Sequence, residues 1–284
     1  MDRLSLGVFC FVLGMVLAHA ASGAEGGLRG GKILLLGDSL FDCHEGKDRI
    51  EHPVGEKLRA LRPGVAWEIV NFARGGMWIG PANATAVEGV AEPLFETETT
   101  GWYFRVLERC SAADAIIVEF SGNDSKVYSP EVFRERLGAL CDRLVKDYPG
   151  ARVFLATGMY LDPDHSSGYW RTPAMVKDWR PGESRNTYLR PYYEETRRLA
   201  KERGFGLADI CQRIKAETEG GNWDLRMRLD DTLDASRDAE HAGDMGWFDN
   251  IHPNLRGTDV MADVLVKTLL GLDGLKPSSR EECR

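Results

Sequence analysis

The sequence has 284 residues and a formal net charge of −8, with both signs of charge spread along the chain. An acidic chain without a basic cluster is a poor partner for nucleic acid, so we expect none. The length is enough for one large domain with a well-buried core.

The first 24 residues have the pattern of a signal peptide. Arg3 precedes an apolar run over residues 4–17, and small residues follow, so that cleavage is expected after Ala20 or Ala24. The run is shorter than the roughly 18–20 residues that span a bilayer, which favours export over a membrane anchor. We therefore expect a signal peptide at 1–24, a linker at 25–31, one domain at 32–272 and a tail at 273–284. The mature protein is expected to be secreted or periplasmic, without stable membrane insertion.

Five short apolar runs predict strands, at residues 33–36, 67–72, 115–120, 152–156 and 205–210. They lack in-out alternation, which is typical of strands covered on both faces in a parallel sheet. Helical patterns lie between them, around 54–61, over 130–144 after the cap Ser129, over 190–203, and after Pro253. The alternation predicts an α/β fold, a three-layer α/β/α sandwich with a five-stranded parallel sheet. Two long stretches, 159–186 and 215–248, do not fit it and are expected to be either functional or disordered loops.

The cysteines indicate no metal site. Cys10 leaves with the signal peptide, and an odd number remains, which implies at least one free thiol or an intermolecular bond. Their spacing matches no metal motif, and we expect neither a metal nor a cofactor. The pairing stays open for Cys43, Cys110, Cys141, Cys211 and Cys283.

Polar clusters follow three of the strands, and a fourth precedes the last helix. They are Gly-Asp-Ser-Leu at 37–40, Asn-Phe-Ala-Arg-Gly-Gly at 71–76, Ser-Gly-Asn-Asp at 121–124 and Asp-Asn-Ile-His at 249–252. Ligands of parallel α/β sheets bind beyond the carboxyl ends of the strands. The four clusters are therefore expected to meet at one edge of the sheet.

In order and in spacing, these clusters resemble the four blocks of the SGNH hydrolase family, the GDSL esterases and lipases. The resemblance covers essentially the whole mature chain and implies a flavodoxin-like SGNH hydrolase fold. It implies that Ser39 is the nucleophile, that Asp249 and His252 form the acid-base pair, and that Gly76 and Asn123 are oxyanion donors. Ser121 stands where the third block of the family usually opens with glycine.

The chemistry of ester hydrolysis needs these residue types. A serine hydroxyl needs a base within hydrogen-bond reach, and that base needs a third group to orient it. Asp249 and His252 lie three apart in a segment expected to enter a helix, close enough for such a pair. The Ser39 N–H, the Gly76 N–H and the Asn123 amide would stabilise the tetrahedral intermediate. The GxSxG elbow of the α/β-hydrolases is absent, which argues against that other serine-esterase fold.

Aromatic residues favour a carbohydrate ester as substrate. Trp78 follows the oxyanion glycine, and Trp170 lies in the aromatic stretch after the fourth strand. Aromatic faces bind sugar rings, whereas a long acyl chain needs an aliphatic channel. The same aromatics would equally serve to pack the loop. We expect a small-molecule or polysaccharide ester with a short acyl group, most simply acetyl on a carbohydrate. The alternatives are a lipase or lysophospholipase, an acyl thioesterase, an O-acyltransferase, and a non-catalytic carbohydrate-binding protein.

Overall fold

The computed structural model describes residues 27–80, 93–97, 99–160, 185–220, 225–228 and 248–272. Within these ranges, the side chains of 185–186, 226–228 and 248–251 are not described. The expected signal peptide and the tail at 273–284 therefore lie outside the described residues, and the predicted domain boundaries stay predictions.

A five-stranded parallel sheet forms the centre of the molecule, with strand order β2-β1-β3-β4-β5. Each apolar run contributes one strand, which confirms the predicted sheet. The strands are β1 (Gly31–Gly37), β2 (Trp67–Asn71), β3 (Ala115–Glu119), β4 (Arg152–Ala156) and β5 (Gly206–Ala208).

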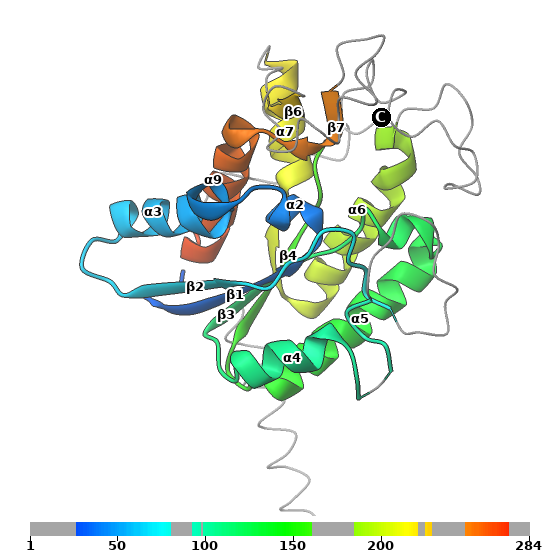
Figure 1. Cartoon of the computed structure of the whole chain (residues 1–284), viewed down its shortest axis with the longest axis horizontal. Coiled ribbons are helices and arrows are strands. Elements are labelled where there is room, and N and C mark those ends of the chain that lie inside the picture. Colours follow the sequence, from blue (N-terminus) through cyan, green and yellow to red (C-terminus); the bar gives the residue numbers. More distant parts are fainter. Residues whose placement is uncertain are drawn as a thin grey trace, which may run out of the picture.

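Helices cover both faces of this sheet, as Figure 1 shows. Alternate side chains of β1 enter two separate apolar cores, Ile33 and Leu35 the first, Leu34 and Leu36 the second. The first core is covered by α3 (Glu51–Leu61), α7 (Ile210–Glu219) and α9 (Leu255–Leu270). The second is covered by α4 (Trp102–Arg109), α5 (Pro130–Asp147) and α6 (Arg185–Arg203). The three-layer α/β/α architecture is confirmed.

Local sequence signals explain where the helices begin. The Ser129 hydroxyl accepts the Val132 N–H at 3.4 Å and caps α5, with Pro130 in the first turn. The Asn254 side chain caps α9 by accepting the Gly257 N–H at 2.9 Å. Both starts agree with the sequence.

Other predicted boundaries were wrong. The last strand of the sheet ends at Ala208, and Asp209 caps α7, because its side chain accepts the Gln212 N–H. Leu61, the last apolar residue of the helical pattern predicted around 54–61, is 51% exposed at the end of α3. Neither α4 nor α7 was predicted.

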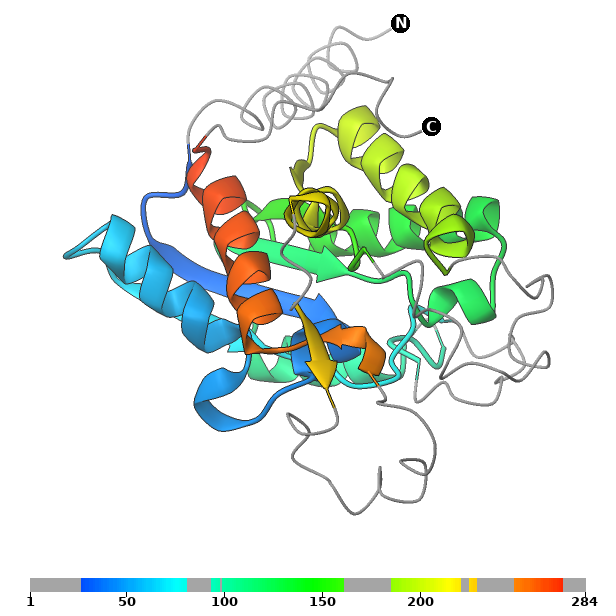
Figure 2. The ribbon, with the colours of Figure 1, turned by 90° about the horizontal axis from the view of Figure 1, so that it is seen from above.

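A second, two-stranded antiparallel sheet was also not predicted. It pairs β6 (Arg226–Arg228) with β7 (Phe248–Pro253), and Figure 2 shows it beside the carboxyl end of β1. The segment 249–252 therefore lies in a strand and not, as expected, in a segment entering a helix. The helix α9 begins after it, at Leu255.

Cys43, Cys110, Cys141 and Cys211 form no disulfide with one another in the part of the chain that the structure describes, and Cys283 lies outside it. Within the described part of the chain, no helix combines the length and the apolar character that crossing a bilayer requires.

Candidate active site

Ser39 lies where β1 ends and the short helix α2 (Ser39–Asp42) begins. It is half-buried, whereas its neighbours Asp38 and Leu40 are buried. The Asp38 side chain caps α2, because its Oδ1 accepts the Leu40 N–H at 3.0 Å. The chain thus turns sharply at the sheet edge and leaves the serine accessible between two anchored residues.

The Asn123 side chain reaches the residue that precedes the nucleophile. Its amide nitrogen lies 3.2 Å from Asp38 Oδ2 and 3.1 Å from the Met77 carbonyl oxygen. Lys126 Nζ donates to Asn123 Oδ1 at 3.1 Å, which directs the NH₂ group toward Asp38. For Asn123 to act as an oxyanion donor, one of its two N–H groups has to turn from these acceptors toward the substrate.

The glycine turn of residues 74–77 packs against Ser39. The Met77 N–H donates to the Arg74 carbonyl oxygen at 3.1 Å, and Gly76 has φ +77°, which glycine adopts without strain. A Cβ placed on Gly75 would lie 3.9 Å from the Ser39 Cβ. The structure therefore brings the predicted Gly76 position, Asn123 and Ser39 to one place.

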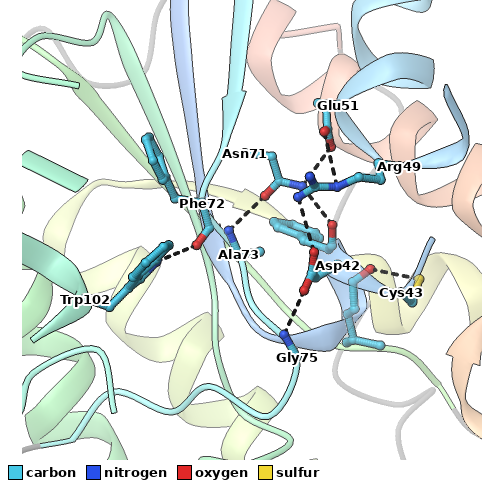
Figure 3. Close-up of polar contacts among 11 residues, drawn as sticks. Asp42, Cys43, Arg49, Glu51, Asn71, Phe72, Ala73, Gly75 and Trp102 are labelled. Carbon is cyan, nitrogen blue, oxygen red and sulfur yellow. Dashed lines mark hydrogen bonds and ion pairs between the residues drawn. The ribbon is translucent and has the colours of Figure 1, made fainter. Parts of the chain in front are cut away.

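A polar network that the sequence analysis missed holds this turn, as Figure 3 shows. Asp42 Oδ2 accepts the Gly75 N–H at 2.9 Å, and Asp42 Oδ1 lies 3.2 Å from Arg49. Arg49 also pairs with Glu51 at 3.3 Å. The Asn71 amide donates to Glu51 at 2.8 Å, so the end of β2 joins the same network. These side chains fix the turn relative to the helix that carries the nucleophile.

His252 lies on β7, which contacts α2. Its ring is close enough to Asp38 and to His44 for electrostatic interaction with both. The neighbouring Pro253 is tethered, because His44 Nε2 donates to its carbonyl oxygen at 3.0 Å. His44 therefore links the segment after the nucleophile to the segment of His252.

The predicted partner Asp249 lies on the same strand, but its side chain is outside the described part. The β6–β7 register pairs Arg226 with Pro253 and Arg228 with Phe248, so a bulge occupies the strand between these pairs. The alternation of a regular strand therefore does not govern Asp249 and His252. Bulges are frequent beside active sites, where they redirect side chains.

Three buried carboxyl groups lie beneath the nucleophile: Asp38, Glu119 and Asp124. Burial raises the pKa of Asp38, and it raises the pKa of Asp124 to about 7. Burial, together with the neighbouring Asp38, raises the pKa of Glu119 well above its ordinary value. No group of three His, Cys, Asp or Glu residues suited to a metal ion occurs among the described residues.

The two aromatic residues predicted to bind substrate have different outcomes. Trp78 is only 2% exposed and packs against Tyr128 with ring centroids 5.6 Å apart. An indole buried in this way packs the protein interior and is not available to a sugar ring. The prediction that Trp78 binds substrate is therefore wrong. Trp170 lies outside the described residues.

Comparison with known proteins gives a family and a fold. A family model described as GDSL-like lipase/acylhydrolase matches residues 35–260. The structure of LAE5, an alpha/beta hydrolase enzyme from the metagenome of Lake Arreo, Spain, is similar with a TM-score of 0.54 at 19% identity, over 86% of this chain and 97% of that one. Axe2, an acetylxylan esterase from Geobacillus stearothermophilus, has a TM-score of 0.52 at 15% identity, over 87% and 95%. No curated protein sequence matches the chain. Identities this low show a shared fold alone.

Proposed function

Because the chain belongs to the GDSL-like lipase/acylhydrolase family, and is therefore a carboxylic ester hydrolase, we propose that it is a serine esterase with Ser39 as its nucleophile. In this proposal His252 is the general base, and Asp249 orients the imidazole ring. The observation that carries it is the position of Ser39, half-buried at the end of β1 between the glycine turn and Asn123.

The proposed reaction proceeds through an acyl-enzyme. His252 takes the hydroxyl proton as Ser39 Oγ attacks the ester carbonyl carbon, and it then protonates the departing alcohol. Water, deprotonated by the same imidazole, then attacks the acyl carbon; the bond from this carbon to Ser39 Oγ breaks, the imidazolium returns its proton to Ser39 Oγ, and the acid is released. The carbonyl oxygen becomes negative in both steps, and the N–H groups of Ser39, Gly76 and Asn123 are the proposed donors to it.

For the substrate, we propose a short acyl group, most simply acetyl, on a carbohydrate. The fold similarity to an acetylxylan esterase supports this choice, as does the aromatic composition of the stretch 159–186. A lipase, lysophospholipase or acyl thioesterase of the same fold is the alternative. An O-acyltransferase would reveal itself when an acceptor alcohol outcompetes water.

We further propose that the mature enzyme is secreted or periplasmic, on the basis of the apolar leader at residues 4–17.

An ester series tests the substrate proposal. Each methylene buried in an acyl tunnel would contribute about 0.8 kcal/mol, so a lipase would show kcat/KM rising steeply from acetyl to octanoyl esters. We expect a maximum at acetyl or propionyl, together with release of acetate from an acetylated polysaccharide. A maximum at octanoyl or longer would replace the carbohydrate proposal by the lipid or thioester alternative.

A further inference from the structure

Glu119 is a buried acid in an apolar strand, and the proposed mechanism gives it no role. It ends β3, whose other residues are Ala, Ile, Ile and Val, and its side chain is 0% exposed. The register of the sheet pairs Glu119 with Gly37, the residue before Asp38. A Cβ on Gly37 would lie 2.8 Å from the Glu119 carbonyl oxygen, so the two strand ends are in close contact.

Neither carboxyl oxygen of Glu119 receives a hydrogen bond from the residues that the structure describes. A buried carboxylate without donors is strongly destabilising. The group that faces it is the Asp38 carboxyl, which is also an acceptor when ionised. Two facing carboxyl groups form a hydrogen bond only when one of them carries a proton.

The surroundings decide which of the two holds the proton. Asp38 accepts from the Leu40 N–H and from the Asn123 amide, and both bonds stabilise its ionised form. The Asp38 backbone N–H favours the ionised form of Glu119, but neither carboxyl oxygen receives a hydrogen bond of normal geometry. Burial and then the negative charge of Asp38 outweigh this N–H and raise the pKa of Glu119. The proton therefore belongs on Glu119.

We propose that Glu119 is a neutral carboxylic acid at neutral pH, that it donates a hydrogen bond to Asp38, and that it is a positioning residue for Ser39 and Asn123. The positioning role rests on the proposed function, whereas the protonated state does not. The other charged or titratable groups that face this pair are Asp124 and Lys126 beside β3 and His252 on β7. The Glu119 proton prevents two like charges from meeting beneath the nucleophile.

The position of Asp38 explains the expected effect on catalysis. Its two oxygens hold the first turn of α2 and the amide of Asn123, and thus both the nucleophile and the proposed oxyanion donor. Loss of the Glu119 donor would leave Asp38 free to shift, and both groups would shift with it. Because these groups act on the transition state, kcat should change more than KM.

The activity test compares two substitutions of equal size. Glu119→Leu removes the donor, and we expect kcat to fall by roughly 10- to 100-fold with little change in KM, the scale for a hydrogen bond to a charged group. Glu119→Gln supplies an amide donor to Asp38 and should restore most of that loss. Wild-type kcat in Glu119→Leu, or an equal loss in both variants, would overturn the positioning role.

The protonated state has its own test, which needs no activity. In protein labelled isotopically at the glutamate carboxyl carbon, infrared spectra at neutral pH should show the carbonyl band of a protonated acid. Glu119→Gln should remove this band, and Asp124→Asn should leave it in place. A spectrum with only ionised glutamate would refute the proposal.

Thermal stability provides a second check. A carboxyl pKa raised by folding makes the folded state hold a proton that the unfolded chain releases above about pH 4.3, so stability is lost as the pH rises. The Tm of the wild type should therefore fall more with rising pH than the Tm of Glu119→Gln. Parallel pH profiles would contradict a proton on Glu119.

The results separate this inference from the proposed function. If the wild type hydrolyses no ester but shows the protonated band, the proposed function fails and the protonated acid stands. If the wild type is an active esterase and Glu119→Leu keeps its kcat, the proposed function stands and the positioning role fails.

Discussion

The two halves of the candidate site are built in different ways. The half that carries Ser39 and Asn123 extends from the ends of β1, β2 and β3, three neighbouring strands of the parallel sheet. The half that carries His252 is a bulged strand of a separate two-stranded sheet. One half takes its geometry from the core, whereas the other depends on a few contacts such as the tether from His44 to Pro253.

This difference separates the contributions that each half should make to catalysis. Sheet ends are anchored by apolar packing on both faces, so donors placed there are preorganised before substrate arrives. A strand outside the sheet has fewer anchors and is more sensitive to substitution of its tethers. The following predictions test this contrast, in order of decreasing effect.

The largest effect is expected from the nucleophile. Ser39→Ala should lower kcat by between about 10⁴- and 10⁶-fold, because no other group takes the acyl chain. A fluorophosphonate should label the wild type covalently and leave this variant unlabelled, as read by intact-protein mass spectrometry. Labelling that persists in Ser39→Ala would remove the serine from its proposed role.

The next largest effect is expected from Asn123, the proposed oxyanion donor at the end of the parallel sheet. Asn123→Ala should lower kcat by roughly 10²- to 10³-fold with little change in KM, the scale for one side-chain donor. Steady-state kinetics on a chromogenic acetate provides the measurement. An unchanged kcat would place Asn123 among the residues that only support Asp38.

A smaller effect is expected from Asp42, which holds the glycine turn of residues 74–77. Asp42→Ala removes the acceptor of the Gly75 N–H, so the turn that presents Gly76 should loosen and kcat should fall between about 10- and 100-fold. Asp142→Ala is the matched control, because Asp142 also pairs with an arginine but lies exposed on α5. Equal kinetics in the two variants would show that the Asp42 network is not needed for catalysis.

The contrast between the two halves also explains what the sequence could predict. Strands covered on both faces are continuous apolar runs, so the five strands and the polar clusters at their ends were visible in the sequence. The strand that carries His252 pairs, among the described residues, with a short charged segment and has no such pattern. Aromatic character does not reveal burial, so Trp78 was misread.

Contacts between segments distant in the chain were harder to foresee. The bond from Asp42 to the Gly75 N–H joins residues that are 33 apart, and no local pattern marks it. Glu119 did leave a signal, since it is a charged residue at the end of a run that was predicted to be buried. A charge in such a run indicates a neighbour that satisfies it, but the sequence does not say which one.

The smallest effect is expected from the hydrogen bond between His44 and the Pro253 carbonyl oxygen, and this effect depends on pH. Burial lowers the pKa of His44, so the folded protein holds this ring neutral while the unfolded chain takes up a proton below about pH 6.5. The contribution of His44 to stability is therefore present above that pH and is lost as the pH falls. His44→Gln keeps a donor for the Pro253 carbonyl oxygen without a titrating ring, so its Tm should fall less than that of the wild type from about pH 8 to about pH 5. The exposed His52 on α3 provides the control, because His52→Gln should retain the wild-type profile. If His44→Gln also retains it, acid sensitivity arises elsewhere and the tether is not its source.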